Sequence, residues 1–267
     1  MSTTLQQVFD KAKSENRAAL IAYIPAGFPT QEGCKKVIKA FVDGGVDAIE
    51  IGFPYSDPVM DGPTIQAAAV TALANGTGAA EVFEALKCAT DLGVAGVVMT
   101  YWNPIERYGV DEFAAAIAAN GGSGVITPDL TIEESQGWVS ATDQAGVNRI
   151  YVVAPSTTDA RLPLVTKMCG GFVYAASLMG VTGTRSSVSS GAPDLVARVR
   201  KSSDLPVAVG LGVSTREQAK GVAGYADGVI VGSAFINKVL ESKSEGDALI
   251  AIEELARELS LGVREGR

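Results

Sequence analysis

Histidine is absent from the sequence, and cysteine occurs only three times. Without histidine the chain cannot form a Ser-His-Asp triad or a Cys-His pair, and most transition-metal sites lose their usual ligand. Cys34, Cys88 and Cys169 are far apart and include no C-x-x-C spacing, which argues against a disulfide framework and a zinc site. The chemistry must therefore come from carboxylates, hydroxyls and backbone amides, and no metal is expected.

Positive charge is scarce as well. The 22 basic and 30 acidic residues give a net charge of −8, and the basic residues are scattered along the chain. We therefore expect no nucleic-acid partner. The first thirteen residues contain no long apolar run and have the pattern of an amphipathic helix. Neither a signal peptide nor a membrane span is expected, and the predicted location is the cytoplasm.

Short apolar runs alternate with helical patterns along the chain, and no two neighbouring runs are joined by a hairpin turn. Such an order requires a parallel sheet. The expected strands are 18–24, 47–52, 95–101, 124–127, 149–154, 172–177, 207–210 and 228–231. The expected helices include 30–41, 63–74, 79–92, 111–119, 131–145, 159–168, 193–200 and 214–222.

Eight such β/α units in 267 residues predict an α/β fold. The specific prediction is one (β/α)₈ TIM-barrel domain over residues 1–267, with an extra N-terminal helix. A doubly wound open sheet is the alternative. That fold would normally carry a glycine-rich fingerprint after its first strand, where Y-I-P-A-G-F-P stands instead.

Two carboxylates stand out in the segment from Val46 to Thr64. Glu50 lies near the end of the second predicted strand, where an ionised side chain is costly unless it is paired or used. Alternation puts Glu50 on a face with small residues, which leaves space for a ligand. Asp61 follows on a stiff, proline-rich loop, where aspartate before Gly-Pro is also ordinary turn chemistry. Both lie where a barrel places its active site.

Glycines at the ends of the last two strands indicate a phosphate site. The segments around Gly212 and around Gly232-Ser233 are each expected to open directly into a helix, offering backbone N–H groups and a positive dipole end. Barrels usually hold phosphate after strands seven and eight. A glycine- and serine-rich loop at 179–193 is interpreted as a lid, from which Gly183 adds a third contact; a plain surface loop is the alternative.

The segment from Glu50 to Thr64, E-I-G-F-P-Y-S-D-P-V-M-D-G-P-T, resembles the signature of the tryptophan synthase alpha subunit family. Further blocks resemble that family in order, among them Y-I-P-A-G-F-P-T, G-V-I-T-P-D-L and A-D-G-V-I-V-G-S-A. The resemblance implies cofactor-free retro-aldol cleavage of indole-3-glycerol phosphate to indole and glyceraldehyde 3-phosphate, in the last steps of L-tryptophan biosynthesis.

The same resemblance implies roles for individual residues. Glu50 and Asp61 would be the catalytic pair, with Tyr174 beside Glu50. The phosphate would be lined by Gly183, Gly212, Gly232 and Ser233. Tyr23 and Tyr101, at the ends of the first and third strands, are expected to flank the indole ring. A raised pKa of Glu50 in an apolar site would allow it to give and take protons near neutrality.

The implied partner is the pyridoxal-phosphate-dependent beta subunit, in an αββα assembly, and pyridoxal phosphate is expected only there. Segments 53–58 and 102–108 are expected to form the docking surface, and the alternative is that their side chains fold back over the site. A phosphosugar isomerase and an inactive regulatory subunit are the rival interpretations. A Schiff-base aldolase is disfavoured because every lysine falls in a predicted helix or its flanks.

Overall fold

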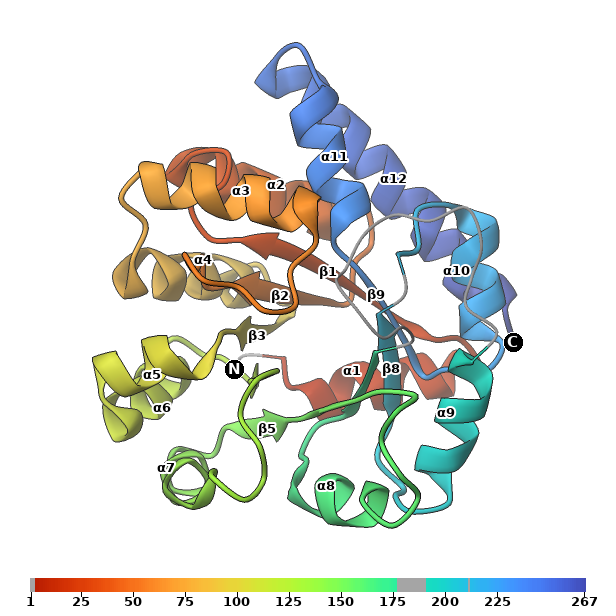
Figure 1. The fold of residues 1–267 in the computed structure, drawn as a ribbon. Helices are drawn as coiled ribbons and strands as arrows, with labels where there is room; N and C mark the ends of the chain where they lie inside the picture. Colours follow the sequence, from red (N-terminus) through yellow and green to blue (C-terminus); the bar gives the residue numbers. More distant parts are fainter. Residues whose placement is uncertain (1–2, 177–190, 211) are drawn as a thin grey trace.

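The computed structural model describes residues 3–176, 191–210 and 212–267. Within these residues, nine strands form one parallel sheet in the order β5-β4-β3-β2-β1-β9-β8-β7-β6 (Figure 1). Only Tyr151 separates β5 from β6, so the two ends of this order are consecutive in the chain and the sheet closes as a barrel. The strands are β1 (Ala19–Pro25), β2 (Ala48–Gly52), β3 (Ala95–Met99), β4 (Gly124–Ile126), β5 (Asn148–Ile150), β6 (Val152–Val153), β7 (Val173–Ala176), β8 (Val207–Gly210) and β9 (Gly228–Val231).

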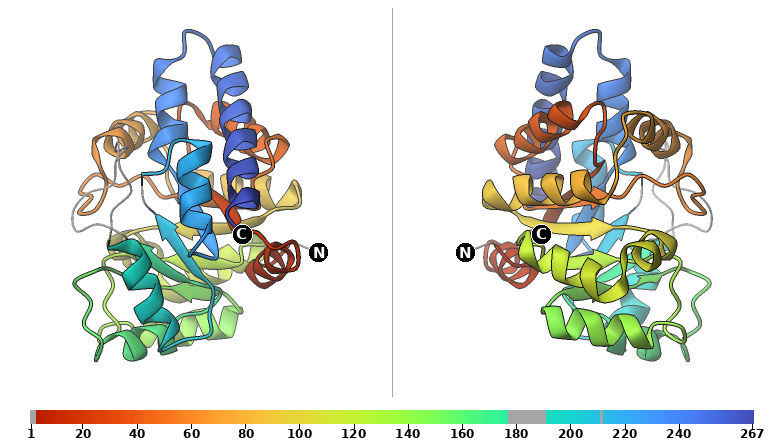
Figure 2. Two further views of the ribbon diagram at one scale, coloured as in Figure 1. Left: turned by 90° about the vertical axis from the view of Figure 1, so that its right-hand side faces the viewer. Right: turned by 90° about the vertical axis from the view of Figure 1, so that its left-hand side faces the viewer.

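Helices surround the barrel, and the two nearest the C-terminus project beyond it as an antiparallel pair (Figure 2). In the described part of the chain these helices are α1 (Leu5–Ser14), α2 (Gln31–Asp43), α3 (Pro63–Ala74), α4 (Ala79–Asp91), α5 (Trp102–Tyr108), α6 (Val110–Ala119), α7 (Gln136–Ala145), α8 (Leu162–Met168), α9 (Ala192–Arg200), α10 (Arg216–Ala223), α11 (Ser233–Glu241) and α12 (Glu245–Glu265). The barrel predicted from the sequence is confirmed, with the extra helix α1 before β1.

Side chains alternate between the outside and the inside of the barrel wall. On β2, Ile49 and Ile51 belong to the large cluster that packs against the outer helices. Ala48, on the opposite face, belongs to an inner cluster. The same inner cluster includes Leu5 and Phe9 of α1, so the N-terminal helix closes the end of the barrel at which the strands begin. The end at which the strands finish is therefore the one that can hold a functional site.

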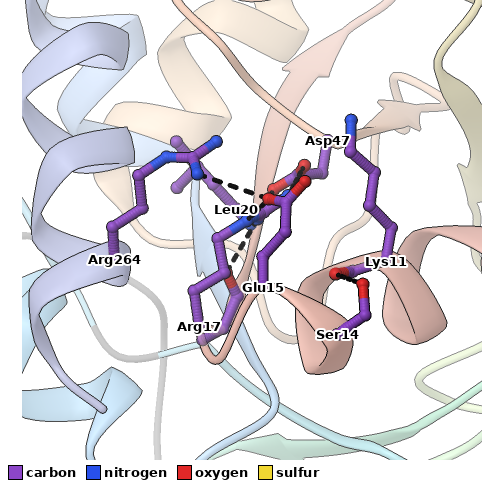
Figure 3. A network of polar contacts seen from close by, with 8 residues as sticks. Lys11, Ser14, Glu15, Arg17, Leu20, Asp47 and Arg264 are labelled. Atoms are coloured by element: carbon purple, nitrogen blue, oxygen red, sulfur yellow. Dashed lines mark hydrogen bonds and ion pairs between the residues drawn. The ribbon is translucent and has the colours of Figure 1, made fainter.

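Ion pairs fix the start of β2 at this closed end of the barrel (Figure 3). Arg17, which is 2% exposed, donates from Nη1 and Nη2 to the two carboxylate oxygens of Asp47 at 2.7 and 2.8 Å. Asp47 also accepts the backbone N–H of Leu20 at 2.9 Å, which ties β2 to β1. Glu15 accepts from Arg17 and, at 3.3 Å, from Arg264 of α12. The network joins the first helix, the first two strands and the last helix.

Asp227, before β9, repeats this arrangement. Its carboxylate accepts the backbone N–H of Val207 at 3.0 Å and pairs with Arg200 and Arg267 at 3.1 and 2.8 Å. Five positions later each strand reaches a glycine that faces the site, Gly52 in one case and Gly232 in the other. An aspartate at the closed end therefore fixes two of the strands that carry the site.

One strand and one helix differ most from their expected bounds, and one further helix was not expected. The fifth strand, expected at 149–154, divides at Tyr151, because β5 pairs with β4 while β6 pairs with β7. The helix expected at 131–145 begins only at Gln136, because Glu133 turns away to form a bidentate ion pair with Arg161. Helix α5 was not predicted. Its first N–H group, on Trp102, is capped by the carboxylate of Asp129 at 3.0 and 3.1 Å.

Candidate active site

Glu50 lies inside the barrel on the middle of β2, opposite Tyr23 of β1 and Val97 of β3. The residue is 1% exposed, and its Oε2 atom is buried without a hydrogen-bond partner among the described residues. Burial, reinforced by the charge of Asp61, raises the pKa of Glu50 to about 8. Glu50 therefore carries a proton at neutral pH and can both give and take one near that pH.

Asp61 is held from the loop that joins β2 to α3. Its Oδ1 accepts a hydrogen bond from the Tyr101 hydroxyl at 3.0 Å, and the same hydroxyl accepts the N–H of Met60 at 3.1 Å. Asp61 is 8% exposed. Burial raises its pKa, and the bond from Tyr101 partly offsets that rise. The loop thus brings a second carboxylate toward the first, as expected from the sequence.

Two further tyrosines face the same space. Tyr23 at the end of β1 is 9% exposed, and Tyr174 comes from β7. Burial raises the pKa of both phenols, and the charges of Glu50 and Asp61 raise them further. The fields of both carboxylates reach both rings, so these side chains form one cluster although their strands are far apart in sequence. Tyr101 also stacks near Tyr55, with ring centroids 5.3 Å apart.

Two glycines that were not predicted as site residues make room for the phenols. A Cβ atom on Gly52 would lie 2.3 Å from the hydroxyl of Tyr23, and one on Gly210 would lie 2.4 Å from the hydroxyl of Tyr174. Both distances are shorter than any tolerated contact. The signal that was available is the position of each glycine at the site end of a strand, where a glycine permits close approach.

The N-terminus of helix α11 forms the end of the site opposite the two carboxylates. Gly232 is the N-cap of α11, and its carbonyl accepts from Phe235 at 2.9 Å and from Ile236 at 3.2 Å. The N–H groups of Ser233 and Ala234 precede these and have no intrahelical acceptor. The helix opens directly after β9, as predicted, and Ser233 is buried. These groups suit an anion.

The prediction for Gly212 needs correction. Gly212 does not open directly into a helix, because α10 begins only at Arg216, after its N-cap Thr215. Gly212 has a φ of +67°, which is the left-handed region that glycine adopts at low cost. Gly212 therefore turns the chain after β8, and its contact with the phosphate stays a prediction. Gly183 and the predicted lid segment lie outside the described residues, except for residues 191–193.

Within the described residues, no group of three or more histidine, cysteine, aspartate or glutamate side chains could hold a metal ion. In the same part of the chain, no helix is long and apolar enough to cross a bilayer. The arrangement consists of a buried carboxylic acid, a second carboxylate, buried phenols and a helix N-terminus that suits an anion. It can move a proton to and from an apolar, phosphorylated substrate.

The chain is similar to one family of known proteins over almost its whole length. A family model described as tryptophan synthase alpha chain matches residues 9–264. The tryptophan synthase alpha chain of Acidothermus cellulolyticus is 53% identical over 262 residues, covering 98% of this chain and 97% of that relative. The corresponding protein of Thermobifida fusca is 53% identical over 265 residues and 98% of each chain.

Solved structures give the same result. A structure of Mycobacterium tuberculosis tryptophan synthase aligns with a TM-score of 0.92 and 48% identity over 99% of both chains. The tryptophan synthase subunit alpha of Legionella pneumophila aligns with a TM-score of 0.86 and 32% identity over 98% of both chains. Similarity of this extent covers the barrel and the site together.

Proposed function

The chain belongs to the tryptophan synthase alpha chain family, and we propose that Glu50 and Asp61 are the catalytic carboxylates of its reaction. The reaction is the cleavage of indole-3-glycerol phosphate to indole and glyceraldehyde 3-phosphate, a carbon–carbon lyase step in tryptophan biosynthesis. One observation carries the assignment of Glu50. This carboxylic acid is 1% exposed, has a pKa of about 8 and has one oxygen without a hydrogen-bond partner in the described part of the chain.

Glu50 can serve both proton transfers of the cleavage. Its acid form gives a proton to C3 of the indole ring, which turns the ring nitrogen into an iminium whose N–H donates to Asp61. The Glu50 carboxylate then takes the proton of the adjacent side-chain hydroxyl. The electrons of that O–H bond form the aldehyde C=O, and the electrons of the breaking C–C bond restore the neutral indole. Glu50 ends in the protonated form in which it began.

Asp61 suits its role because it is already fixed. The Tyr101 hydroxyl holds one carboxylate oxygen at 3.0 Å, which leaves the other for the indole N–H. A preorganised acceptor stabilises positive charge as it develops, without reorganising at that moment. We propose that Tyr23 and Tyr101, which are both buried, flank the flat indole ring, and that Tyr174 stands beside Glu50.

The phosphate is assigned to the start of α11. The N–H groups of Ser233 and Ala234 and the positive end of the helix dipole favour a dianion there. Gly232 brings the backbone close, and Gly212 shapes the neighbouring turn after β8. We also propose Gly183 as a contact, on the strength of the family motif alone.

The partner of this chain is the beta subunit of tryptophan synthase. We propose that it docks over the site end of the barrel, where Val59 is 68% and Tyr108 is 44% exposed. Phe53 and Trp102 instead pack against Phe113 and Trp138 in the described structure. We further propose a single domain over residues 1–267, a cytoplasmic location and no cofactor in this chain, with pyridoxal phosphate confined to the beta subunit.

The function is tested by incubating the chain with indole-3-glycerol phosphate, alone and with a beta subunit, while indole is measured. We expect indole release by the chain alone and a higher rate with the beta subunit, because docking favours the closed site. Isomerisation of a phosphosugar without indole release would support the isomerase alternative. If no indole is released either with or without the beta subunit, the result would support an inactive regulatory subunit.

A further inference from the structure

Tyr23 lies between the two ends of the proposed site. At one end, a Cβ atom on Gly232 would lie 3.2 Å from Cδ1 of the Tyr23 ring. At the other end, a Cβ atom on Gly52 would lie 2.3 Å from the Tyr23 hydroxyl. The ring therefore reaches from the anion-binding helix to β2. Its hydroxyl is held directly over Gly52 and has little freedom to move, because the side chain is 9% exposed.

The Tyr23 hydroxyl lies over Gly52, which is the next residue after Glu50 on the same face of β2. Gly52 follows Glu50 by two residues, so both face the barrel interior and are separated along β2 by about 6.6 Å. Strand β1 places Tyr23 directly opposite Glu50 in the sheet register. A glutamate side chain that extends toward the site end of the barrel therefore approaches the hydroxyl of Tyr23.

Glu50 needs a hydrogen-bond donor when it is ionised. After it has given up its proton, a negative charge remains in a site that excludes water, and such a charge is costly without a donor. The charge of Asp61 repels that of an ionised Glu50. The hydroxyl of Tyr101 already donates to Oδ1 of Asp61, so it does not serve as the donor to Glu50. Among the described residues the Oε2 atom of Glu50 has no partner, so an acceptor position is open.

We infer that the Tyr23 hydroxyl donates a hydrogen bond to the ionised form of Glu50 during the reaction, which makes Tyr23 a positioning residue for proton transfer. This inference rests on the proposed function of Glu50. In the described part of the chain, the titratable groups near Glu50 are Tyr23 from β1, Tyr174 from β7 and Asp61 from the loop after β2. Burial and the two carboxylate charges raise the pKa of Tyr23, so its hydroxyl keeps the proton that it must donate.

The test is Tyr23→Phe, which keeps the ring and removes only the donor. Removing a donor from a carboxylate raises the pKa of that carboxylate. The basic limb, which is the fall of kcat/KM at alkaline pH, should therefore move to a higher pH by about one unit, and kcat should fall about tenfold. Gly52→Ala is a second variant, because its methyl group displaces the hydroxyl, and it should move the limb in the same direction. Tyr225→Phe, at the closed end of the barrel, removes a buried hydroxyl elsewhere and should leave the limb in place.

The pKa of Glu50 should also be read without substrate, from the infrared band of its protonated carboxyl group, using Glu50→Gln to assign the band. An upward shift of the Glu50 pKa in Tyr23→Phe supports the inference whatever the activity. An unchanged pKa and an unchanged limb overturn it, and so does a shift that follows Tyr174→Phe but not Tyr23→Phe. Full activity of Glu50→Gln is a different result, because it overturns the proposed role of Glu50 itself.

Discussion

Glu50 is a carboxylic acid in surroundings that stabilise its neutral form. Its neighbours in the register are Tyr23 and Val97, and burial together with the charge of Asp61 raises its pKa to about 8. A glutamate with its ordinary pKa would be ionised at neutral pH and could not begin the cleavage as an acid. The raised pKa is therefore the property that links the position of this residue to its proposed chemistry.

The pH dependence of the reaction follows from the two carboxylates. Asp61 must be ionised to receive the indole N–H, so kcat/KM should rise with pH through the pKa of Asp61, which burial raises above its usual range. Glu50 must be protonated, so kcat/KM should fall again near pH 8. Steady-state kinetics across this range check the profile. A descending limb centred near pH 5 would contradict the assigned protonation states.

Glu50 should also lower the stability of the fold as the pH rises. Between the ordinary glutamate pKa of 4.5 and the folded-state pKa of about 8, the folded protein keeps a proton that the unfolded chain has released. The folded state binds more protons in this window, so the free energy of unfolding falls with rising pH. Glu50→Gln lacks this pH dependence and should be more stable than the wild type at pH 8, by at most about 4–5 kcal/mol.

Urea unfolding of both proteins at pH 5 and pH 8 measures this effect. The gain from Glu50→Gln should be small at pH 5 and larger at pH 8. Glu254→Gln, an exposed substitution of the same chemistry, serves as the control and should show no such trend. A Glu50→Gln protein that is less stable than the wild type at pH 8 would indicate that the ionised carboxylate is paired after all.

The sequence was sufficient to find the carboxylates, because a buried strand that carries glutamate and a proline-rich loop that carries aspartate are unusual locally. The sequence was not sufficient to find the contacts that hold these carboxylates and the neighbouring phenols in place. Tyr101 was expected to flank the indole ring, and the hydrogen bond from its hydroxyl to Asp61, which is 40 positions away in the chain, was not foreseen. Gly52 was expected only to leave space beside Glu50, because its close contact with Tyr23 depends on the neighbouring strand. Contacts of this kind arise only when the barrel closes.

At the scale of elements, periodicity predicted the strands and most helices, while ends and breaks depended on distant partners. Strands β8 and β9 have the predicted bounds. Helix α5 was missed because its cap is Asp129, which lies beyond β4. The first predicted turn of α7 does not form, because Glu133 pairs with Arg161 near α8. Local patterns cannot reveal a cap or an ion pair that comes from another element.

The aspartates at the closed end of the barrel allow a test at this scale. Asp47→Asn removes a negative charge from beside the buried guanidinium of Arg17. This change should lower the free energy of unfolding by about 3–5 kcal/mol. Asp227→Asn is the matched variant, and its cost should be smaller because the side chains of Arg200 and Arg267 are 44% and 23% exposed.

Denaturant unfolding of the two variants makes the comparison directly. Equal losses would show that the shared bond to a neighbouring strand, rather than the buried ion pair, sets the cost. Both variants should keep the pH profile of the reaction, because the two aspartates lie at the end of the barrel away from the site.

At the scale of the whole molecule, the barrel separates stability from function. The closed end carries α1 and the ion pairs of Asp47 and Asp227, whereas the other end collects the carboxylates, the phenols and the start of α11. The predicted barrel closure was correct because eight β/α units allow few other solutions. The exchange of strand partners at Tyr151 was not predictable, since it follows from that closure.

The central claim is that Glu50 is the acid and base of the cleavage, and the most direct measurement is indole release by Glu50→Gln in complex with the beta subunit. Glutamine fills the same space and cannot transfer a proton. We expect the cleavage rate to fall by about 10² or more, while the same complex still joins added indole to serine, which shows that the assembly is intact. A Glu50→Gln complex that releases indole at nearly the wild-type rate would contradict the account.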